Sequence, residues 1–223
     1  MLGNIFILGD SYSTFRDYIP EGYSAYYTAE GPWYVRKEGG SALAPEDVLH
    51  VEETWWYNLA KENGNLVRNC SWSGTTVCHT GQDGADCSAK SFIGRFEKLI
   101  EEGFFKENKM DTFFFFGGTN DSWVDSPLGE PKESGWTRED TYKALPGFSY
   151  LLNKVIETLP DAKIYCIINT GLKEEIASFY KEYSQKRGVG VIELCDIDKK
   201  DGHPTILGMA QIREQVLSFV KSK

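Results

Sequence analysis

Near its start the chain runs Asn4-Ile5-Phe6-Ile7-Leu8, which leads directly into Gly9-Asp10-Ser11. Four consecutive apolar residues without polar alternation predict a strand that is buried on both faces. Four further runs of this kind follow along the chain: Asn65–Asn69, Thr112–Phe116, Lys163–Ile168 and Gly188–Leu194. Five such strands are typical of a parallel sheet that helices cover on both faces.

Helical patterns separate the predicted strands. Apolar residues at helical spacing predict helices over Glu53–Glu62, Ser91–Glu101, Tyr142–Leu159 and Lys173–Arg187. A last helix is expected from Pro204 onward, because a proline in the first helical turn gives up an N–H that has no partner there. This alternation predicts an α/β fold, a three-layer α/β/α flavodoxin-like sandwich with a central five-stranded parallel sheet. In such folds the site lies outside the carboxyl ends of the strands.

Two segments interrupt this alternation, at about 12–52 and 122–139. We interpret residues 1–223 as a single domain, because a chain of this length supports one large core, and the two segments as insertions in it. Both insertions contain aromatic residues, which argues against disorder. Both leave from the carboxyl ends of predicted strands, so we expect them to rim the site, with Trp33 and Trp123 as candidate substrate-binding residues.

The composition disfavours several classes of partner. A net charge of -9 argues against nucleic acid and anionic membrane surfaces, which bind clustered Lys and Arg, and favours a neutral or weakly polar substrate. No apolar run approaches the roughly 20 residues of a membrane-spanning helix. No secretory signal pattern precedes the first strand, so the chain is expected to be cytoplasmic, or exported with its signal peptide absent from this sequence. The oligomeric state stays open.

The chain has five cysteines, and an odd number cannot pair completely, which fits reduced thiols better than a complete disulfide framework. A bridge between Cys78 and Cys87 stays open. His79 lies beside Cys78, but the spacing of these residues matches no recognised zinc-binding pattern. We therefore expect no metal site, and the chemistry considered below requires no organic cofactor.

Ser11 follows the first strand directly, so its hydroxyl is expected to face the crevice at the edge of the sheet. A serine hydroxyl is a poor nucleophile unless a base is positioned beside it. Of the three histidines, His203 is the best candidate, because it precedes the last predicted helix, whose dipole favours a neutral imidazole. His50 and His79 lie in loop-like sequence and are interpreted as surface residues.

Two further strand ends carry groups that can stabilise a developing oxyanion. Asn120 follows the third strand within Gly117-Gly118-Thr119-Asn120-Asp121 and offers a side-chain N–H. Gly74, in Ser73-Gly74-Thr75 after the second strand, offers a backbone N–H. Because the carboxyl ends of parallel strands meet at one edge of the sheet, we expect both groups to lie beside Ser11.

With these motifs in this order, the sequence resembles the SGNH hydrolases, also called the GDSL esterase/lipase superfamily, from Gly9 to the final helix. The resemblance implies a serine hydrolase that cleaves carboxylic esters through an acyl-enzyme. It implies Ser11 as the nucleophile and His203 as the general base of a catalytic triad. The oxyanion hole would consist of Ser11, Gly74 and Asn120.

The acidic member of the triad departs from the family pattern. The family places it three positions before the histidine, where this chain has Lys200. Asp201, two positions before His203, is the expected acid, because a carboxylate normally accepts a hydrogen bond from the second ring nitrogen and fixes the tautomer. Asp198 or a backbone carbonyl is the alternative, and the latter would leave a Ser–His dyad.

Two rival interpretations belong to the class of binding proteins. The same fold can serve as a catalytically inactive, flavodoxin-like ligand-binding module, since fold does not determine function. The Trp- and Tyr-rich insertions suggest a carbohydrate-binding module, although these aromatic residues can equally pack the long loops onto the sheet. Because many members of the resembled family remove acetyl groups from sugars, esterase and sugar binding combine in a carbohydrate O-acetyl esterase. The expected partner is therefore a small-molecule or oligosaccharide ester.

Overall fold

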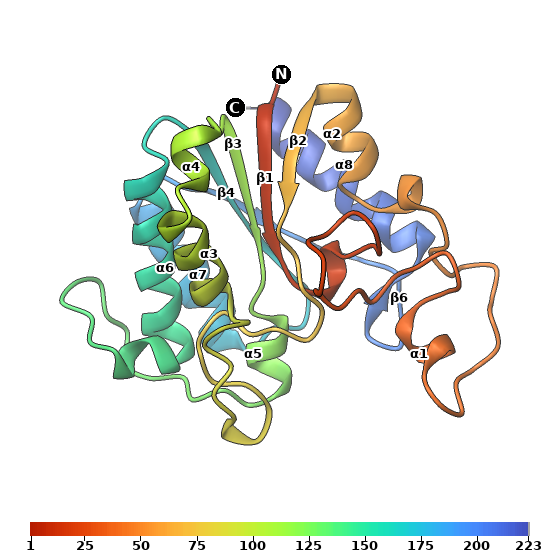
Figure 1. Cartoon of the computed structure of the whole chain (residues 1–223), viewed down its shortest axis with the longest axis horizontal. Coiled ribbons are helices and arrows are strands. Elements are labelled where there is room, and N and C mark those ends of the chain that lie inside the picture. Colours follow the sequence, from red (N-terminus) through yellow and green to blue (C-terminus); the bar gives the residue numbers. More distant parts are fainter. Residues whose placement is uncertain (223) are drawn as a thin grey trace.

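The computed structural model describes residues 1–222 and contains one five-stranded parallel sheet (Figure 1). The strands are β1 (Gly3–Gly9), β2 (Gly64–Asn69), β3 (Thr112–Phe116), β4 (Lys163–Ile168) and β5 (Gly190–Glu193). Their order across the sheet is β2-β1-β3-β4-β5, with every pair parallel. The chain thus reverses direction across the sheet between β1 and β3, which is the switch point where flavodoxin-like folds place their ligands. The predicted fold class is confirmed.

Helices cover both faces of the sheet (Figure 1). One face carries α3 (Phe92–Glu101), α4 (Phe104–Glu107), α6 (Ala144–Thr158) and α7 (Glu174–Lys186), and the other carries α2 (Tyr57–Asn63) and α8 (Ile206–Lys221). Side chains of β3 alternate between the two cores: Phe113 and Phe115 pack in the first, Phe114 and Phe116 in the second. Burial of both sets explains why the strand sequences lack polar alternation.

The remaining elements are short and lie mostly at the carboxyl end of the sheet. They are α1 (Trp33–Arg36), α5 (Thr119–Trp123), the 3-10 turns at Ser11–Ser13, Val51–Glu53, Gln82–Gly84 and Glu139–Tyr142, and the two-residue strands β6 (Lys199–Lys200) and β7 (His203–Pro204). None of these was expected as a separate element, because single turns and two-residue strands are too short to leave a periodic pattern.

The last helix begins at Ile206 and not at the predicted Pro204. Thr205 is the N-cap, and its hydroxyl accepts a hydrogen bond from the backbone N–H of Gly208 at 3.2 Å. Pro204 instead belongs to β7, which pairs antiparallel with β6. His203 therefore lies in a small hairpin, two residues further from the helix than the sequence suggested.

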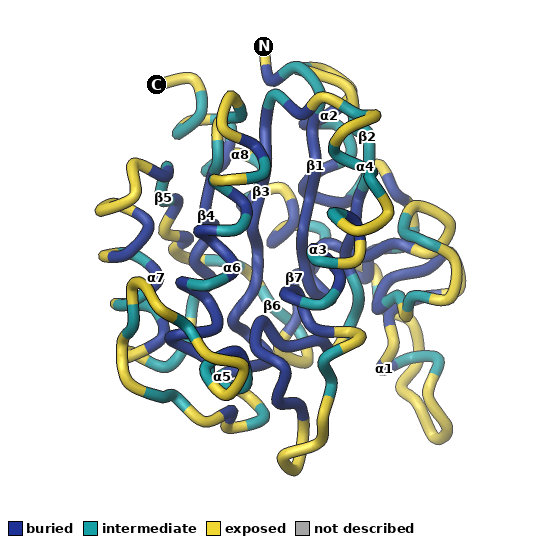
Figure 2. The backbone as a smooth tube through the Cα atoms, turned by 60° about the vertical axis from the view of Figure 1, so that its left-hand side comes forward, coloured by how far each residue is buried: buried dark blue, intermediate teal, exposed yellow. Residues whose placement is uncertain are grey.

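Residues 12–52 form an extended insertion with little regular structure (Figure 1). Its buried aromatic residues, among them Tyr12, Tyr26, Tyr27 and Tyr34, pack into the second core. Much of the stretch from α1 to Val48, by contrast, is exposed (Figure 2). Most of the aromatic residues thus hold the insertion on the sheet, as one of the two sequence interpretations expected.

All five cysteines carry free thiols, so no Cys78–Cys87 bridge is present. Cys78 is buried and its thiol lies 3.7 Å from the backbone carbonyl oxygen of Thr80. Within residues 1–222, no helix has both the length and the apolar character needed to cross a bilayer.

Candidate active site

Ser11 lies in a tight turn that follows β1 directly. The Asp10 carboxylate accepts a hydrogen bond from the backbone N–H of Tyr12 at 3.1 Å and thereby caps the turn. Gly9 precedes it where a Cβ would lie 2.6 Å from the hydroxyl oxygen of Ser71, so only glycine fits. The Ser11 side chain is thus held by a rigid strand end at the switch point of the sheet.

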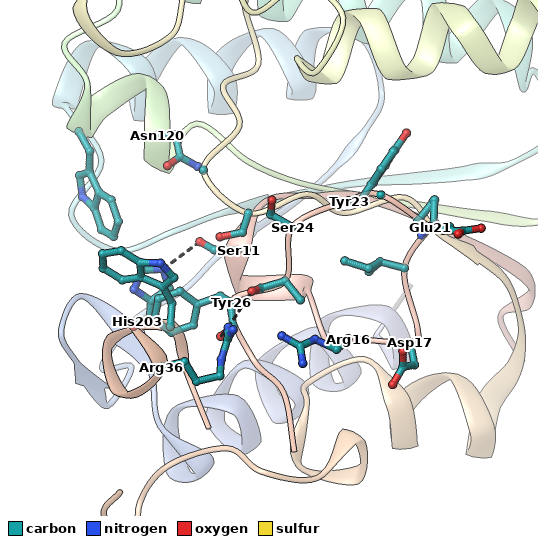
Figure 3. Close-up of a pocket in the computed structure, with 18 residues that line it drawn as sticks. Ser11, Arg16, Asp17, Glu21, Tyr23, Ser24, Tyr26, Arg36, Asn120 and His203 are labelled. Carbon is teal, nitrogen blue, oxygen red and sulfur yellow. Dashed lines mark hydrogen bonds between the residues drawn. The ribbon is translucent and has the colours of Figure 1, made fainter. Parts of the chain in front are cut away.

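His203 reaches Ser11 from the β6–β7 hairpin, and its Nε2 lies 2.9 Å from the Ser11 Oγ (Figure 3). Two tyrosines of the insertion hold this hairpin in place. The Tyr12 hydroxyl donates to the carbonyl oxygen of Gly202, and the Tyr27 hydroxyl donates to that of Pro204 at 2.8 Å. The contact between the two residues, which are 192 positions apart, therefore depends on the insertion as well as on the sheet.

The second ring nitrogen of His203 lies 3.0 Å from the backbone carbonyl oxygen of Asp201. A carbonyl oxygen can only accept, so Nδ1 carries the proton and Nε2 presents its lone pair to Ser11. This differs from the expected carboxylate of Asp201 and matches the backbone alternative. The physical reason is the hairpin turn, where Asp201 has a left-handed backbone with φ of 49°. The Asp198 carboxylate accepts instead from the hydroxyl of Thr205.

Aromatic rings enclose the His203 imidazole. The Tyr26 ring is stacked on it at a centroid distance of 3.5 Å and an interplanar angle of 9°. Trp123 approaches edge-on at 5.5 Å. Burial is the main reason that the pKa of His203 falls to about 4, although the Asp201 carbonyl acts in the opposite direction. The imidazole is therefore neutral near pH 7, through burial rather than through the helix dipole that the sequence suggested.

The two predicted oxyanion donors lie on neighbouring segments: Gly74 on the loop after β2, and Asn120 at the start of α5. The side-chain amide of Asn120, in α5, donates to the carbonyl oxygen of Thr75 at 3.0 Å, next to Gly74. Gly74 has a φ of 77°, and nothing lies within 4 Å of the position a Cβ would take. The buried Asp121 carboxylate ties the same loops together by accepting from the backbone N–H groups of Val77 at 2.8 Å and Cys78 at 3.2 Å.

Ser11, Gly74, Asn120 and His203 line a common cavity of about 810 Å³ (Figure 3). The insertion supplies most of the other lining residues, between Arg16 and Arg36. Both predicted substrate-binding tryptophans, Trp33 and Trp123, line it as well, and each is 50% exposed. The structure thus gathers the sequence candidates around one cavity, with Asp201 taking part through its main chain.

A protein-family model for GDSL-like lipases/acylhydrolases matches residues 3–220. The chain belongs to this family. It is accordingly a hydrolase that acts on ester bonds. A search of curated proteins found no match.

Solved structures of GDSL-like proteins are similar over the whole chain. A protein from Bacteroides ovatus, described as a candidate GDSL-like lipase, is 42% identical with a TM-score of 0.86, and the match covers 100% of both chains. A second from Bacteroides uniformis is 40% identical with a TM-score of 0.86, covering 99% of this chain and 96% of that one. A family two carbohydrate esterase from Clostridium thermocellum, in complex with cellohexaose, shares the fold at 16% identity and a TM-score of 0.60, covering 99% of this chain and 64% of that one.

Sequence reasoning missed several residues around the site of this GDSL-family hydrolase. Tyr12, Tyr26 and Tyr27 were noticed only as members of an aromatic segment, and Asp121 only as the last residue of the motif Gly118-Thr119-Asn120-Asp121. That motif was the one signal that could have assigned Asp121 a structural role. The interpretation of His79 as a surface residue is wrong, because His79 is 8% exposed and its Nδ1 lies 2.8 Å from the Ser91 Oγ.

Proposed function

We propose that this GDSL-family hydrolase is a carbohydrate O-acetyl esterase that works through a Ser11–His203 dyad. The observation that carries the proposal is the 2.9 Å contact between the Ser11 hydroxyl and the neutral His203 at the wall of a cavity. Binding of a ligand alone requires no such contact, which is why a hydrolase is favoured over a catalytically inactive module.

The dyad transfers the acyl group in two steps. His203 Nε2 removes the proton of the Ser11 hydroxyl while the Ser11 Oγ attacks the ester carbonyl carbon. The backbone N–H groups of Ser11 and Gly74 and the side-chain amide of Asn120 donate to the oxyanion that develops, each contributing about 3 kcal/mol. The protonated His203 then gives its proton to the departing alcohol oxygen. A water molecule, deprotonated by His203, releases the acyl group as a carboxylic acid and restores Ser11.

The Asp201 carbonyl replaces the carboxylate of a triad in orienting the ring. It accepts the Nδ1 proton and so keeps the lone pair of Nε2 directed at Ser11. The stacked ring of Tyr26 adds a second constraint on the plane of the imidazole. A carbonyl dipole stabilises the imidazolium less than a full negative charge does, but two orienting contacts still provide a positioned base.

The carbohydrate assignment rests on the cavity walls. Trp33 and Trp123 are half-exposed although they are large apolar side chains, and both line the cavity that contains Ser11. Exposed aromatic rings beside a site indicate a flat ligand surface that covers them when bound. The Clostridium thermocellum esterase, which has the same fold, was solved with cellohexaose, and this is consistent with a sugar ligand here.

Labelling and a substrate panel test the proposal. A fluorophosphonate probe is expected to label the native protein on Ser11 and to leave the Ser11→Ala variant unlabelled. Acetylated sugars are expected to give higher kcat/KM than p-nitrophenyl acetate, and p-nitrophenyl acetate higher kcat/KM than the butyrate. Absence of labelling would refute the nucleophile, and a strong preference for butyrate would refute the acetyl specificity.

A further inference from the structure

Two arginines line the cavity that contains Ser11, although the chain as a whole is acidic, with a net charge of -9. Arg16 and Arg36 both come from the insertion. Figure 3 shows the Arg16 guanidinium pointing toward Arg36, whose own guanidinium lies beside Tyr26. The net charge of the whole chain led us to expect a neutral substrate, but this part of the cavity wall carries positive side chains.

Arg36 is held firmly but is not neutralised. Its Nε donates to the carbonyl oxygen of Gly31 at 2.8 Å, and its Nη2 donates to those of Ala25 and Tyr26 at 3.0 Å each. Within residues 1–222, no carboxylate lies within ion-pair distance of this guanidinium. Carbonyl oxygens satisfy its N–H groups without cancelling its charge, and a guanidinium stays protonated at any physiological pH.

Arg36 is also close to the reacting groups. It donates to the main chain of Tyr26, whose ring is stacked on His203 at 3.5 Å. Because His203 gives its proton to the leaving alcohol in the proposed reaction, a group on the His203 side of the cavity is placed to meet the alcohol part of the ester rather than the acyl part. A charge recognised there belongs to the sugar.

Arg16 adds a second positive charge that is only partly offset. Its Nη1 lies 3.1 Å from an oxygen of Glu30, and the two side chains are 50% and 64% exposed. Burial lowers the pKa of Arg36, the charge of Arg16 lowers it further, and the charge of Glu30 acts in the opposite direction. Two further acids, Asp17 and Glu21, line the cavity, but their carboxylates point away from Ser11 at its far end (Figure 3). Arg16 and Arg36 thus place two positive charges on this part of the cavity wall, which the charge of Glu30 partly offsets. The Asp201 carboxylate is a further negative charge near His203.

We propose that the substrate is an acetylated sugar that carries a carboxylate, as a uronic acid does, and that Arg36 and Arg16 bind this carboxylate. This inference rests on the proposed esterase function and specifies its alcohol part. Carbonyl oxygens occupy Nε and Nη2 of Arg36, so its Nη1 is the nitrogen that donates to a carboxylate oxygen, with the charge of Arg16 nearby. A charge-assisted hydrogen bond from a guanidinium to a carboxylate is stronger than one to a neutral hydroxyl.

A matched pair of esters tests the inference: a methyl O-acetyl-glucuronide and the methyl O-acetyl-glucoside with the acetyl group at the same position. The two differ only in a carboxylate against a hydroxymethyl group. The native enzyme is expected to have at least about fivefold higher kcat/KM for the glucuronide, the scale of one partly screened ion pair. In 0.5 M NaCl this ratio is expected to fall, since exposed charges are screened.

Two variants change the local charge in opposite directions. Arg16→Gln is expected to lower the glucuronide-to-glucoside ratio by about threefold, and Glu30→Gln to raise it by a similar factor, because Glu30 offsets Arg16. Lys98→Gln is the matched control: it removes another exposed cation that is paired with a glutamate, from α3 and outside the cavity lining, and is expected to leave the ratio unchanged. Arg36→Lys is less decisive, since it also removes hydrogen bonds that hold the insertion.

The outcomes separate this inference from the proposed function. Equal kcat/KM for both esters, with hydrolysis that depends on Ser11, would overturn the carboxylate site alone. A higher kcat/KM for a 6-sulfated sugar ester than for the glucuronide would overturn the carboxylate and show that the site prefers a sulfate. If neither ester is hydrolysed in a Ser11-dependent way, the esterase proposal fails. Calorimetric titration with the unacetylated methyl glucuronide and methyl glucoside then still tests the site, and equal affinities would refute it.

Discussion

The molecule contains two buried Ser–His contacts of nearly the same length. Ser11 Oγ lies 2.9 Å from Nε2 of His203, and Ser91 Oγ lies 2.8 Å from Nδ1 of His79. The serines are 2% and 0% exposed and the histidines 9% and 8%. Burial lowers the pKa of both histidines. Distance, burial and charge state therefore do not distinguish a candidate catalytic pair from a structural one.

The difference lies in what else the serine oxygen contacts. Ser91 is the N-cap of α3: its hydroxyl accepts from the backbone N–H of Gly94 at 3.0 Å and donates to the carbonyl oxygen of Ser88 at 3.1 Å. Its proton and lone pairs are committed to the helix end. For Ser11 Oγ, the contact with His203 is the one hydrogen bond among residues 1–222, and Ser11 lines a cavity beside Asn120 and Gly74.

A Ser–His contact thus becomes a candidate nucleophile only when the oxygen keeps a free lone pair, a substrate can reach it and oxyanion donors face it. The Ser11 pair meets the first two conditions, and Ser11 shares its cavity with the proposed donors Gly74 and Asn120. The Ser91 pair fails the first, and Ser91 does not line the cavity that contains Ser11. The predictions below test whether this distinction holds.

The largest effect is expected from removing the two serine hydroxyls in turn. Ser11→Ala should lower kcat by more than about a thousandfold, because the acyl-enzyme cannot form. Ser91→Ala should keep kcat within about threefold and lower the free energy of unfolding by about 1 kcal/mol, through loss of the helix cap. Ester hydrolysis and urea denaturation measure the two quantities. A folded Ser91→Ala variant without activity would contradict the comparison.

The next effect is expected at the proposed oxyanion donors, which line the cavity of the Ser11 pair. Asn120→Ala should lower kcat by about a hundredfold to a thousandfold with a smaller change in KM, since the donor acts mainly in the transition state. Steady-state kinetics give both constants, and a melting curve checks that the loop held by Asp121 is intact. Asn169→Ala is a matched control, because Asn169 donates to the nearby Thr119 hydroxyl but does not line the cavity. Equal losses in both variants would indicate a purely structural effect.

The pH dependence reports the burial of His203. Since its pKa lies at about 4 rather than near 6.5, the base stays neutral and active as the pH falls to about 5. The acidic limb of the kcat/KM profile should therefore have its midpoint near pH 4. At pH 5.5 an ordinary histidine would already be about nine-tenths protonated, a roughly tenfold loss that is not expected here. A midpoint near pH 6.5 would show that His203 is solvated or paired with a carboxylate.

The smallest effect is expected from the carboxylate of Asp201. Asp201→Asn keeps the backbone carbonyl, and Asn tolerates the left-handed conformation at this turn, so kcat should change by less than about threefold. Loss of a triad carboxylate would instead lower kcat by about ten-thousandfold. The kinetics of Asp201→Asn and of Asp198→Asn distinguish a dyad from a triad. A decrease in kcat of a thousandfold or more in either variant would show that the carboxylate of that residue orients His203.

Residues at strand ends were predictable because their position follows from local pattern and sheet topology together. Ser11, Gly74 and Asn120 each follow a strand, and parallel strands present their carboxyl ends at one edge. His203 was predictable as one of only three histidines, by its place near the last helix. Its real element, a two-residue strand in a hairpin, has no periodicity and was missed.

The sequence by itself determined the sheet, the covering helices and the residues at the strand ends, because these depend on apolar periodicity and on neighbours in the chain. Only the tertiary structure decided which Ser–His contact faces a cavity, that a carbonyl orients His203, and that two arginines lie beside it. Each of these depends on partners brought together from distant segments, as when Tyr12 holds Gly202 across 190 positions. Side-chain contacts of that range follow from packing, and no local pattern encodes them.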